Sequence, residues 1–295
     1  MGKKSRRRKV APGSARVTRP VIAHVSRPFE GLAAEEALVA MRDIIPAATM
    51  RATLTEEYGS REITLVTMLP DAAQALIRAD GEILLALQTR SHSGDASHDL
   101  GVALSAALAR RDAIGAGDAS AGAIYVDVRD AGPRFTDMVA DFAELTIESD
   151  LGFWVAPQAA EDEEVRHAIA ESGEELIPTA LVPDTGVTVW HRMDRIFVRW
   201  VRSEDESSLF TAMARLAVRD ELTIGHGSAF IGAFRASGLL IPVFEVPEDV
   251  EADALTDGVK TLNTNLAKAL SSTDPVDDDV RRVRAGLVSR QVPIR

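Results

Sequence analysis

The stretch IIPAATMRATLTEEYGSREITLVTMLP, residues 44–70, decides the fold class. Met50 to Thr55 and Glu62 to Leu69 are two short runs of residues that suit strands, and the turn Tyr58-Gly59-Ser60 separates them. This pattern predicts two neighbouring strands, and Pro70 ends the second because proline cannot donate a hydrogen bond within a sheet. The chain therefore contains a β-sheet.

Helical and strand patterns alternate on both sides of this pair. A helix is predicted before it, over Gly31 to Asp43, where apolar residues recur on one face. After it we expect a strand at Ile83 to Gln88, a helix at His98 to Arg110 and a strand at Ile124 to Val128. The first half of the chain thus follows the order helix, three strands, helix, strand.

A similar order recurs in the second half, where Leu176 to Ala180 echoes Ile44 to Ala48. The sequence therefore predicts an α+β fold of two similar α/β units with mostly antiparallel sheets, which we interpret as an internal duplication. We expect a disordered basic tail at 1–20, a first unit at 21–150 and a second unit with C-terminal helices at 151–295. The elements predicted in the second unit are a helix at Glu163 to Ser172, strands at Val187 to Trp190 and Ile196 to Val201, a helix around Leu209 to Leu216, and strands at Ala229 to Phe234 and Leu239 to Val246.

Three further segments are predicted to be helices. Apolar residues between Phe135 and Phe142, and again between Leu255 and Leu270, fall on single helical stripes. In the last segment Pro275 suits the first helical position, the acidic run Asp277 to Asp279 suits the first turn, and Gly286 suits the C-terminal end.

Composition limits the class of protein. The chain has 295 residues, of which 46% are hydrophobic and 26% charged, as in globular proteins. It contains no cysteine, which excludes disulfides, thiol catalysis and cysteine-ligated metals, and which favours a cytoplasmic location. No apolar run is long enough to cross a membrane, and Val21 to Ala23 is too short for the core of a signal peptide.

Charge is distributed unevenly along the chain. Residues 1–20 hold eight lysines and arginines and no acid, so they carry +8; the whole chain carries −12, which leaves −20 for the rest. Such an arm favours electrostatic contact with RNA, the ribosome or DNA, whereas a solubilising leader is the alternative. The candidate contact residues are Lys3, Lys4, Arg6, Arg7, Arg8 and Lys9.

One segment is dense in polar side chains, the loop from Ser91 to Asp99 between a predicted strand and a predicted helix. We expect it to cap that helix without binding metal. Two alternatives remain open, an anion site at the helix N-terminus and a metal or acid–base site, which His191 or His226 would join if the fold brings one of them near. The candidate residues are His92, Ser93, Asp95, His98 and Asp99.

Catalytic and cofactor motifs are missing from the sequence. Gly225-His226-Gly227 lacks the spacing and the lysine of a phosphate loop and is predicted to be a tight turn. Neither a Gly-x-Ser-x-Gly elbow nor a His-Glu-x-x-His helix occurs. We therefore predict no cofactor and assign no catalytic residue.

Several short motifs resemble an actinobacterial family known as domain of unknown function 5926. Relatives in that family carry a small cysteine-rich zinc motif of the SEC-C type ahead of the shared domain, which this chain cannot form without cysteine. The resemblance supplies no catalytic residues. The matching motifs are Arg27 to Leu32, Ile45 to Thr49, Ser93 to Asp95, Phe153 to Val155 and Gly286 to Val292.

Two classes of function follow from these observations. The first is a non-catalytic adaptor whose basic tail contacts RNA, the ribosome or the nucleoid while the body binds a protein partner. The second is an enzyme or small-ligand-binding protein that uses the loop from Ser91 to Asp99. A pocket lined by that loop and a remote histidine would favour the second class, whereas an exposed apolar strand face would favour the first.

Overall fold

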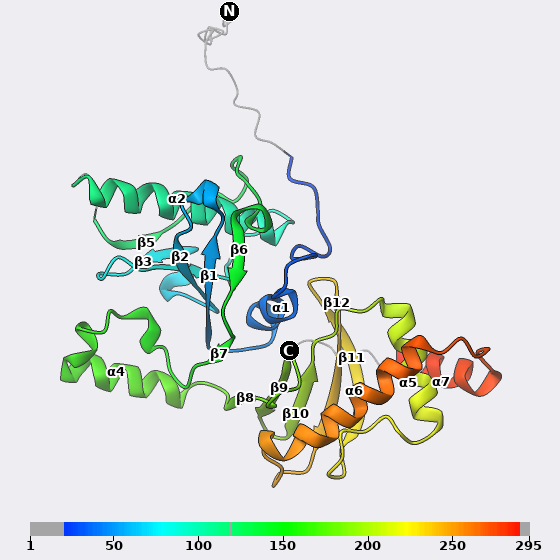
Figure 1. Ribbon diagram of the computed structural model, residues 1–295. Coiled ribbons are helices and arrows are strands. Elements are labelled where there is room, and N and C mark those ends of the chain that lie inside the picture. The colour runs from blue at the N-terminus through cyan, green and yellow to red at the C-terminus, as the bar shows by residue number, and fades with distance from the viewer. Residues whose placement is uncertain (1–20, 118–119, 290–295) are drawn as a thin grey trace, which may run out of the picture.

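The computed structural model describes residues 21–117 and 120–289, and in these it contains seven α-helices and two β-sheets (Figure 1). The first part comprises α1 (Glu35–Asp43), β1 (Ala48–Leu54), β2 (Glu62–Val66), β3 (Ala75–Ile77), β4 (Ile83–Ala86), α2 (Ala96–Gly115), β5 (Gly122–Ile124), α3 (Phe135–Met138), β6 (Val139–Phe142) and β7 (Thr146–Ile147). The second part comprises α4 (Glu163–Glu174), β8 (Thr179–Leu181), β9 (Thr188–Arg192), β10 (Ile196–Trp200), α5 (Glu206–Val218), β11 (Ala229–Ala236), β12 (Leu239–Val246), α6 (Thr256–Ser271) and α7 (Asp278–Ser289).

The first sheet has the order β5-β3-β4-β2-β1-β6, with β7 also paired to β1. Strands β1 and β2 pair antiparallel as predicted, with Met50 opposite Leu65. In β1 the side chains alternate between the two faces, so Met50 and Ala52 are buried while Arg51 between them is exposed. Among the strand pairs in the part of the chain that the structure describes, β2–β4 alone is parallel.

The second sheet has the order β11-β12-β10-β9-β8 and is antiparallel throughout. Together the two sheets confirm the predicted α+β fold with mostly antiparallel strands. They give no evidence of an internal duplication: β4 pairs parallel with β2, whereas β10 pairs antiparallel with both of its neighbours.

Several predicted boundaries are wrong, and three segments illustrate the differences. The segment from Phe135 to Phe142 is a single helical turn, α3, followed by strand β6, because β6 pairs with β1 and that pairing overrides the helical spacing. Strand β5 ends at Ile124 rather than Val128. Asp277 precedes α7 and accepts a hydrogen bond from the Val280 amide at 2.8 Å, and α7 continues through Gly286 to Ser289.

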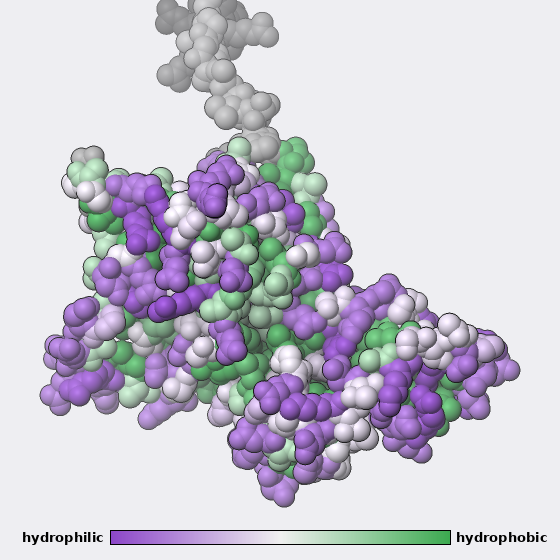
Figure 2. Space-filling model, viewed as in Figure 1, coloured by the Kyte–Doolittle hydropathy of each residue, from purple (hydrophilic) through white to green (hydrophobic). Residues whose placement is uncertain are grey.

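The largest hydrophobic core is shared between the two sheets. Helix α1 lies between them (Figure 1), and its buried Leu38, Val39 and Met41 belong to the same core as Val201 and Ile241 of the second part. A second core lies on the other face of the second sheet, under α5, α6 and α7. Figure 2 shows hydrophobic residues gathered in the middle of the visible face, where the sheets approach each other.

The hairpin that joins β11 to β12 connects the second sheet to α1. Its two turn residues, Ser237 and Gly238, both have positive φ angles, 44° and 83°, as a type I′ turn requires. The Ser237 hydroxyl donates a hydrogen bond to Asp43 at 2.8 Å, and Arg42 donates one to the same hydroxyl at 3.3 Å. We call this contact between the hairpin turn and the end of α1 the junction.

Candidate functional site

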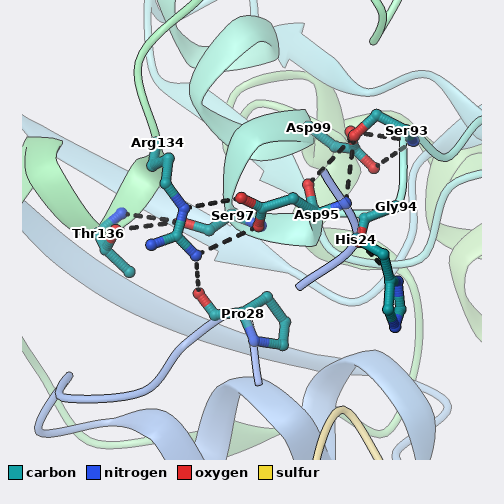
Figure 3. Close-up of polar contacts among 9 residues, drawn as sticks. All are labelled: His24, Pro28, Ser93, Gly94, Asp95, Ser97, Asp99, Arg134 and Thr136. Atoms are coloured by element: carbon teal, nitrogen blue, oxygen red, sulfur yellow. Dashed lines mark hydrogen bonds and ion pairs between the residues drawn. The ribbon is translucent and has the colours of Figure 1, made fainter. Parts of the chain in front are cut away.

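The loop from Ser91 to Asp99 leads from β4 into α2 and caps that helix, as predicted; the capping residue is Asp95. Its carboxylate accepts a hydrogen bond from the Ser97 amide at 3.0 Å. Arg134 approaches the same carboxylate with two nitrogens, at 2.7 and 3.3 Å, and also donates to the Pro28 carbonyl at 3.0 Å (Figure 3). The capping residue therefore also holds α2 to the segment that precedes α1.

Asp99 lies one turn into α2 and is more than nine-tenths buried, with 8% of its surface exposed. Both of its carboxylate oxygens lie 3.2 Å from the Ser93 amide (Figure 3). Within residues 21–117 and 120–289 no other hydrogen bond reaches this carboxylate. Because a carboxylate can accept several hydrogen bonds, Asp99 keeps unused acceptor capacity.

The two loop histidines have different environments. His92 is exposed, whereas His98 belongs to α2, is 5% exposed and places Nε2 3.0 Å from the Asp130 carbonyl. A third histidine joins the loop from a distance: His24 places Nδ1 3.1 Å from the Gly94 carbonyl (Figure 3). The structure does not bring His191 or His226 to the loop; His191 is buried in β9, and neither lines the cleft described next.

A cleft of about 480 Å³ opens beside the loop. Four segments line it: the chain from His24 to Pro28, the end of α1, the loop itself, and residues 235–238 of the β11–β12 hairpin. We call it the junction cleft, because the hairpin and the end of α1 that meet at the junction form part of its wall. A smaller hollow of about 10 Å³ shares Arg42 and Asp99 with the cleft, and Phe29, Leu87 and Leu100 line it as well.

Charged side chains face the junction cleft from both parts of the chain. Arg235 pairs through two nitrogens with Glu206 of α5, and this hydrogen bonding lowers the pKa of the Glu206 carboxyl. Arg42 is half-buried and, among the residues that the structure describes, has no carboxylate partner. Asp43 and Asp99 line the same cleft. Among the described residues, the wall thus offers the guanidinium of Arg42, which has no carboxylate partner there, and the carboxylates of Asp43 and Asp99.

The structure describes the candidate metal-binding residues of the loop but not the candidate nucleic-acid contacts of the tail. In the described part of the chain no group of three or more histidine, aspartate or glutamate side chains is arranged to hold a metal ion. The tail residues Lys3 to Lys9 lie outside the described residues. No helix in the described ranges is long and apolar enough to cross a membrane.

Sequence reasoning missed most of the residues that complete the cleft. His24, Arg42 and Ser237 are isolated in the sequence, between about 20 and 200 positions apart, and no spacing rule connects them. The one usable signal was the dipeptide Ser237-Gly238, which suits a tight turn between two apolar runs. That signal predicts the hairpin but not the helix end that the hairpin contacts.

The fold and the cleft define an α+β protein in which two sheets share a core around one helix, with an open cleft beside the end of that helix. The chain belongs to a family of unknown function, DUF5926, whose model matches residues 28–295. A search of curated proteins with this sequence finds no match, and a search of solved structures finds none either.

Proposed function

We propose that this protein binds a small polar molecule in the junction cleft. The observation that carries the proposal is the convergence, in one cleft, of the loop from Ser91 to Asp99, the remote His24 and the unpaired Arg42. Small-molecule sites are concave, form where structural units meet, and combine an apolar surface with a few fixed polar groups. The junction cleft has each of these properties.

The groups that face the cleft are held in place by the surrounding structure. Gly94 accepts hydrogen bonds from both the Val25 amide, at 3.0 Å, and His24. Arg42 at the end of α1 donates a hydrogen bond to the Ser237 hydroxyl at 3.3 Å. A binding site gains affinity when its groups are already ordered, because less conformational entropy is lost when the ligand binds.

The proposal is tested by equilibrium dialysis of the full chain against a cytosolic extract of small molecules, followed by mass spectrometry. Ser26 is exposed and lines the cleft, so Ser26→Trp fills the cleft from its rim. Thr261→Trp on the exposed face of α6 is the matched control. We expect wild type and Thr261→Trp to enrich the same compound and Ser26→Trp to lose most of that enrichment.

Equal enrichment by all three proteins would place the binding elsewhere and contradict the proposal. Failure of wild type to enrich any compound would contradict it as well. Unfolding curves in urea show whether Ser26→Trp keeps the stability of wild type, so that a loss of enrichment reports on the cleft rather than on folding.

A second candidate function rests on the charge of residues 1–20. Their +8 against −20 for the rest of the chain favours the cytosolic adaptor, with the tail contacting RNA, the ribosome or DNA and the body binding a protein. If six tail cations contact single-stranded RNA, log affinity should fall with log salt with a slope of about −4. Filter binding of the full chain and of residues 21–295 between about 50 and 200 mM salt measures this slope. Equal retention of RNA by both proteins would refute the tail hypothesis.

A further inference from the structure

The carboxylate of Asp99, which lines the junction cleft, can accept further hydrogen bonds from a positively charged or N–H-bearing group of a ligand. It is more than nine-tenths buried, and within the described ranges its hydrogen-bonding partner is the Ser93 amide, at 3.2 Å to each oxygen. Burial of a charged group is unfavourable unless hydrogen bonds or an opposite charge compensate it. Because the Ser93 amide makes these contacts at a long distance and uses only part of the acceptor capacity of Asp99, a ligand can supply a further donor.

Arg42 lines the same cleft and can bind a negatively charged group of a ligand. Its guanidinium makes one hydrogen bond among the described residues, to the Ser237 hydroxyl, and has no carboxylate partner there. Arginine presents a planar set of donors that matches a carboxylate with two parallel hydrogen bonds. The free donors of Arg42 therefore favour a carboxylate on the ligand.

Arg42 and Asp99 line the same two hollows. Both line the hollow of about 10 Å³, which has room for about one water molecule, and both also line the junction cleft. A ligand that satisfies both side chains must carry its two charges a short distance apart. An α-amino acid does so, because a single carbon bears both its ammonium and its carboxylate.

The charge balance of the cleft favours a ligand with both charges. Arg235 is neutralised by Glu206, which leaves Arg42 facing Asp43 and Asp99. A purely anionic ligand such as phosphate would meet two carboxylates, and a purely cationic ligand would leave Arg42 without a partner. We propose that the junction cleft binds a small zwitterion of the α-amino acid class, with its carboxylate on Arg42 and its ammonium on Asp99.

This inference rests on the proposed function and is tested by calorimetric titration of the full chain with the standard α-amino acids. Each amino acid that binds is then compared with its N-acetyl form, which lacks the ammonium, with its amide, which lacks the carboxylate, and with inorganic phosphate. We expect saturable binding of at least one amino acid, and at least about tenfold weaker binding of each one-charge analogue and of phosphate.

Two conservative variants locate the two contacts. Asp99→Asn keeps an oxygen for the Ser93 amide and removes the charge, and Arg42→Gln removes the guanidinium. Each should weaken binding of the amino acid at least about tenfold, and Asp99→Asn should weaken the N-acetyl form much less. Arg51→Gln and Asp137→Asn, at exposed positions outside the cleft, are the matched controls and should bind as wild type does.

The outcomes separate this inference from the proposed function. If dialysis yields a compound that depends on an open cleft but amino acids do not bind, the cleft is a site for another class of ligand and the zwitterion inference is wrong. Equal affinity for phosphate or for a one-charge analogue would also overturn it. If Ser26→Trp changes the binding of no compound at all, the proposed function fails first.

Discussion

Lowering the pH from about 7.5 to about 4.5 should reduce the free energy of unfolding by about 2.5 kcal/mol through His191 alone. His191 is 1% exposed in β9, and burial, followed by the nearby positive charge of Arg199, lowers its pKa to about 3. At pH 4.5 the unfolded chain therefore binds a proton at this histidine and the folded chain does not. The stability contributed by His191 is complete above pH 6.5 and is lost as the pH falls towards 3.

The local geometry explains why the folded protein resists this proton. The Thr179 hydroxyl donates to the Ile177 carbonyl at 2.8 Å, so it accepts a hydrogen bond from Nδ1 of His191, 3.1 Å away. This chain of hydrogen bonds assigns the hydrogen to Nδ1 and leaves Nε2 bare. Nε2 is buried and has no partner among the described residues. A proton there would have no acceptor and would lie near Arg199.

Urea unfolding of wild type and His191→Phe at both pH values measures the effect. The variant removes the titrating group while Thr179 keeps its bond to Ile177. His167→Phe is the matched control, because His167 is exposed on α4. We expect the loss of stability on acidification to be about 2.5 kcal/mol smaller in His191→Phe than in the other two proteins. An identical loss in all three would show that His191 is not the group responsible.

Gly238→Ala should destabilise the protein by about 3 kcal/mol. Its φ of +83° is strained for any residue with a side chain, and an added Cβ would lie 2.7 Å from the Ser26 carbonyl oxygen and 2.8 Å from Cβ of Arg27. Strain of this kind costs about 1 kcal/mol, and overpacking at a tight contact costs about 1–3 kcal/mol more. The hairpin turn must then move away from the chain that lines the junction cleft.

Gly81→Ala is the matched control for this substitution. Gly81 has a φ of +87°, and an added Cβ there meets no atom within 4 Å, so it carries the strain without the contact. Chemical denaturation of the two variants should show Gly238→Ala to be less stable by about 2 kcal/mol. If the two lose equal stability, the close packing of the hairpin against Ser26 and Arg27 is not a property of the protein in solution.

The sequence predicted the elements that have strong local signals. The two strands around Tyr58, the helix that Asp95 caps and the β11–β12 hairpin each combine a periodic apolar pattern with a recognisable turn or cap. Strands β3, β7 and β8 escaped prediction because they are two or three residues long, which is too short to show an alternating apolar pattern.

The candidate site was predicted only in part, for a related reason. Asp95 and Asp99 lie in one loop, where local sequence indicates a helix cap, whereas Arg42 and Ser237 reach the same cleft only because the β11–β12 hairpin packs against the end of α1. That contact depends on a core shared between the two sheets, which no local pattern encodes. The burial of His98 was missed because it depends on the distant segment around Asp130, whose carbonyl lies 3.0 Å from His98 Nε2.

The most direct test of ligand binding in the junction cleft is a crystal structure of the full chain equilibrated with the compound that dialysis enriches most. We expect that compound to occupy the cleft, with polar atoms within hydrogen-bonding distance of Arg42 and Asp99. The compound bound on another surface, with only water between the hairpin and the loop from Ser91 to Asp99, would contradict the account.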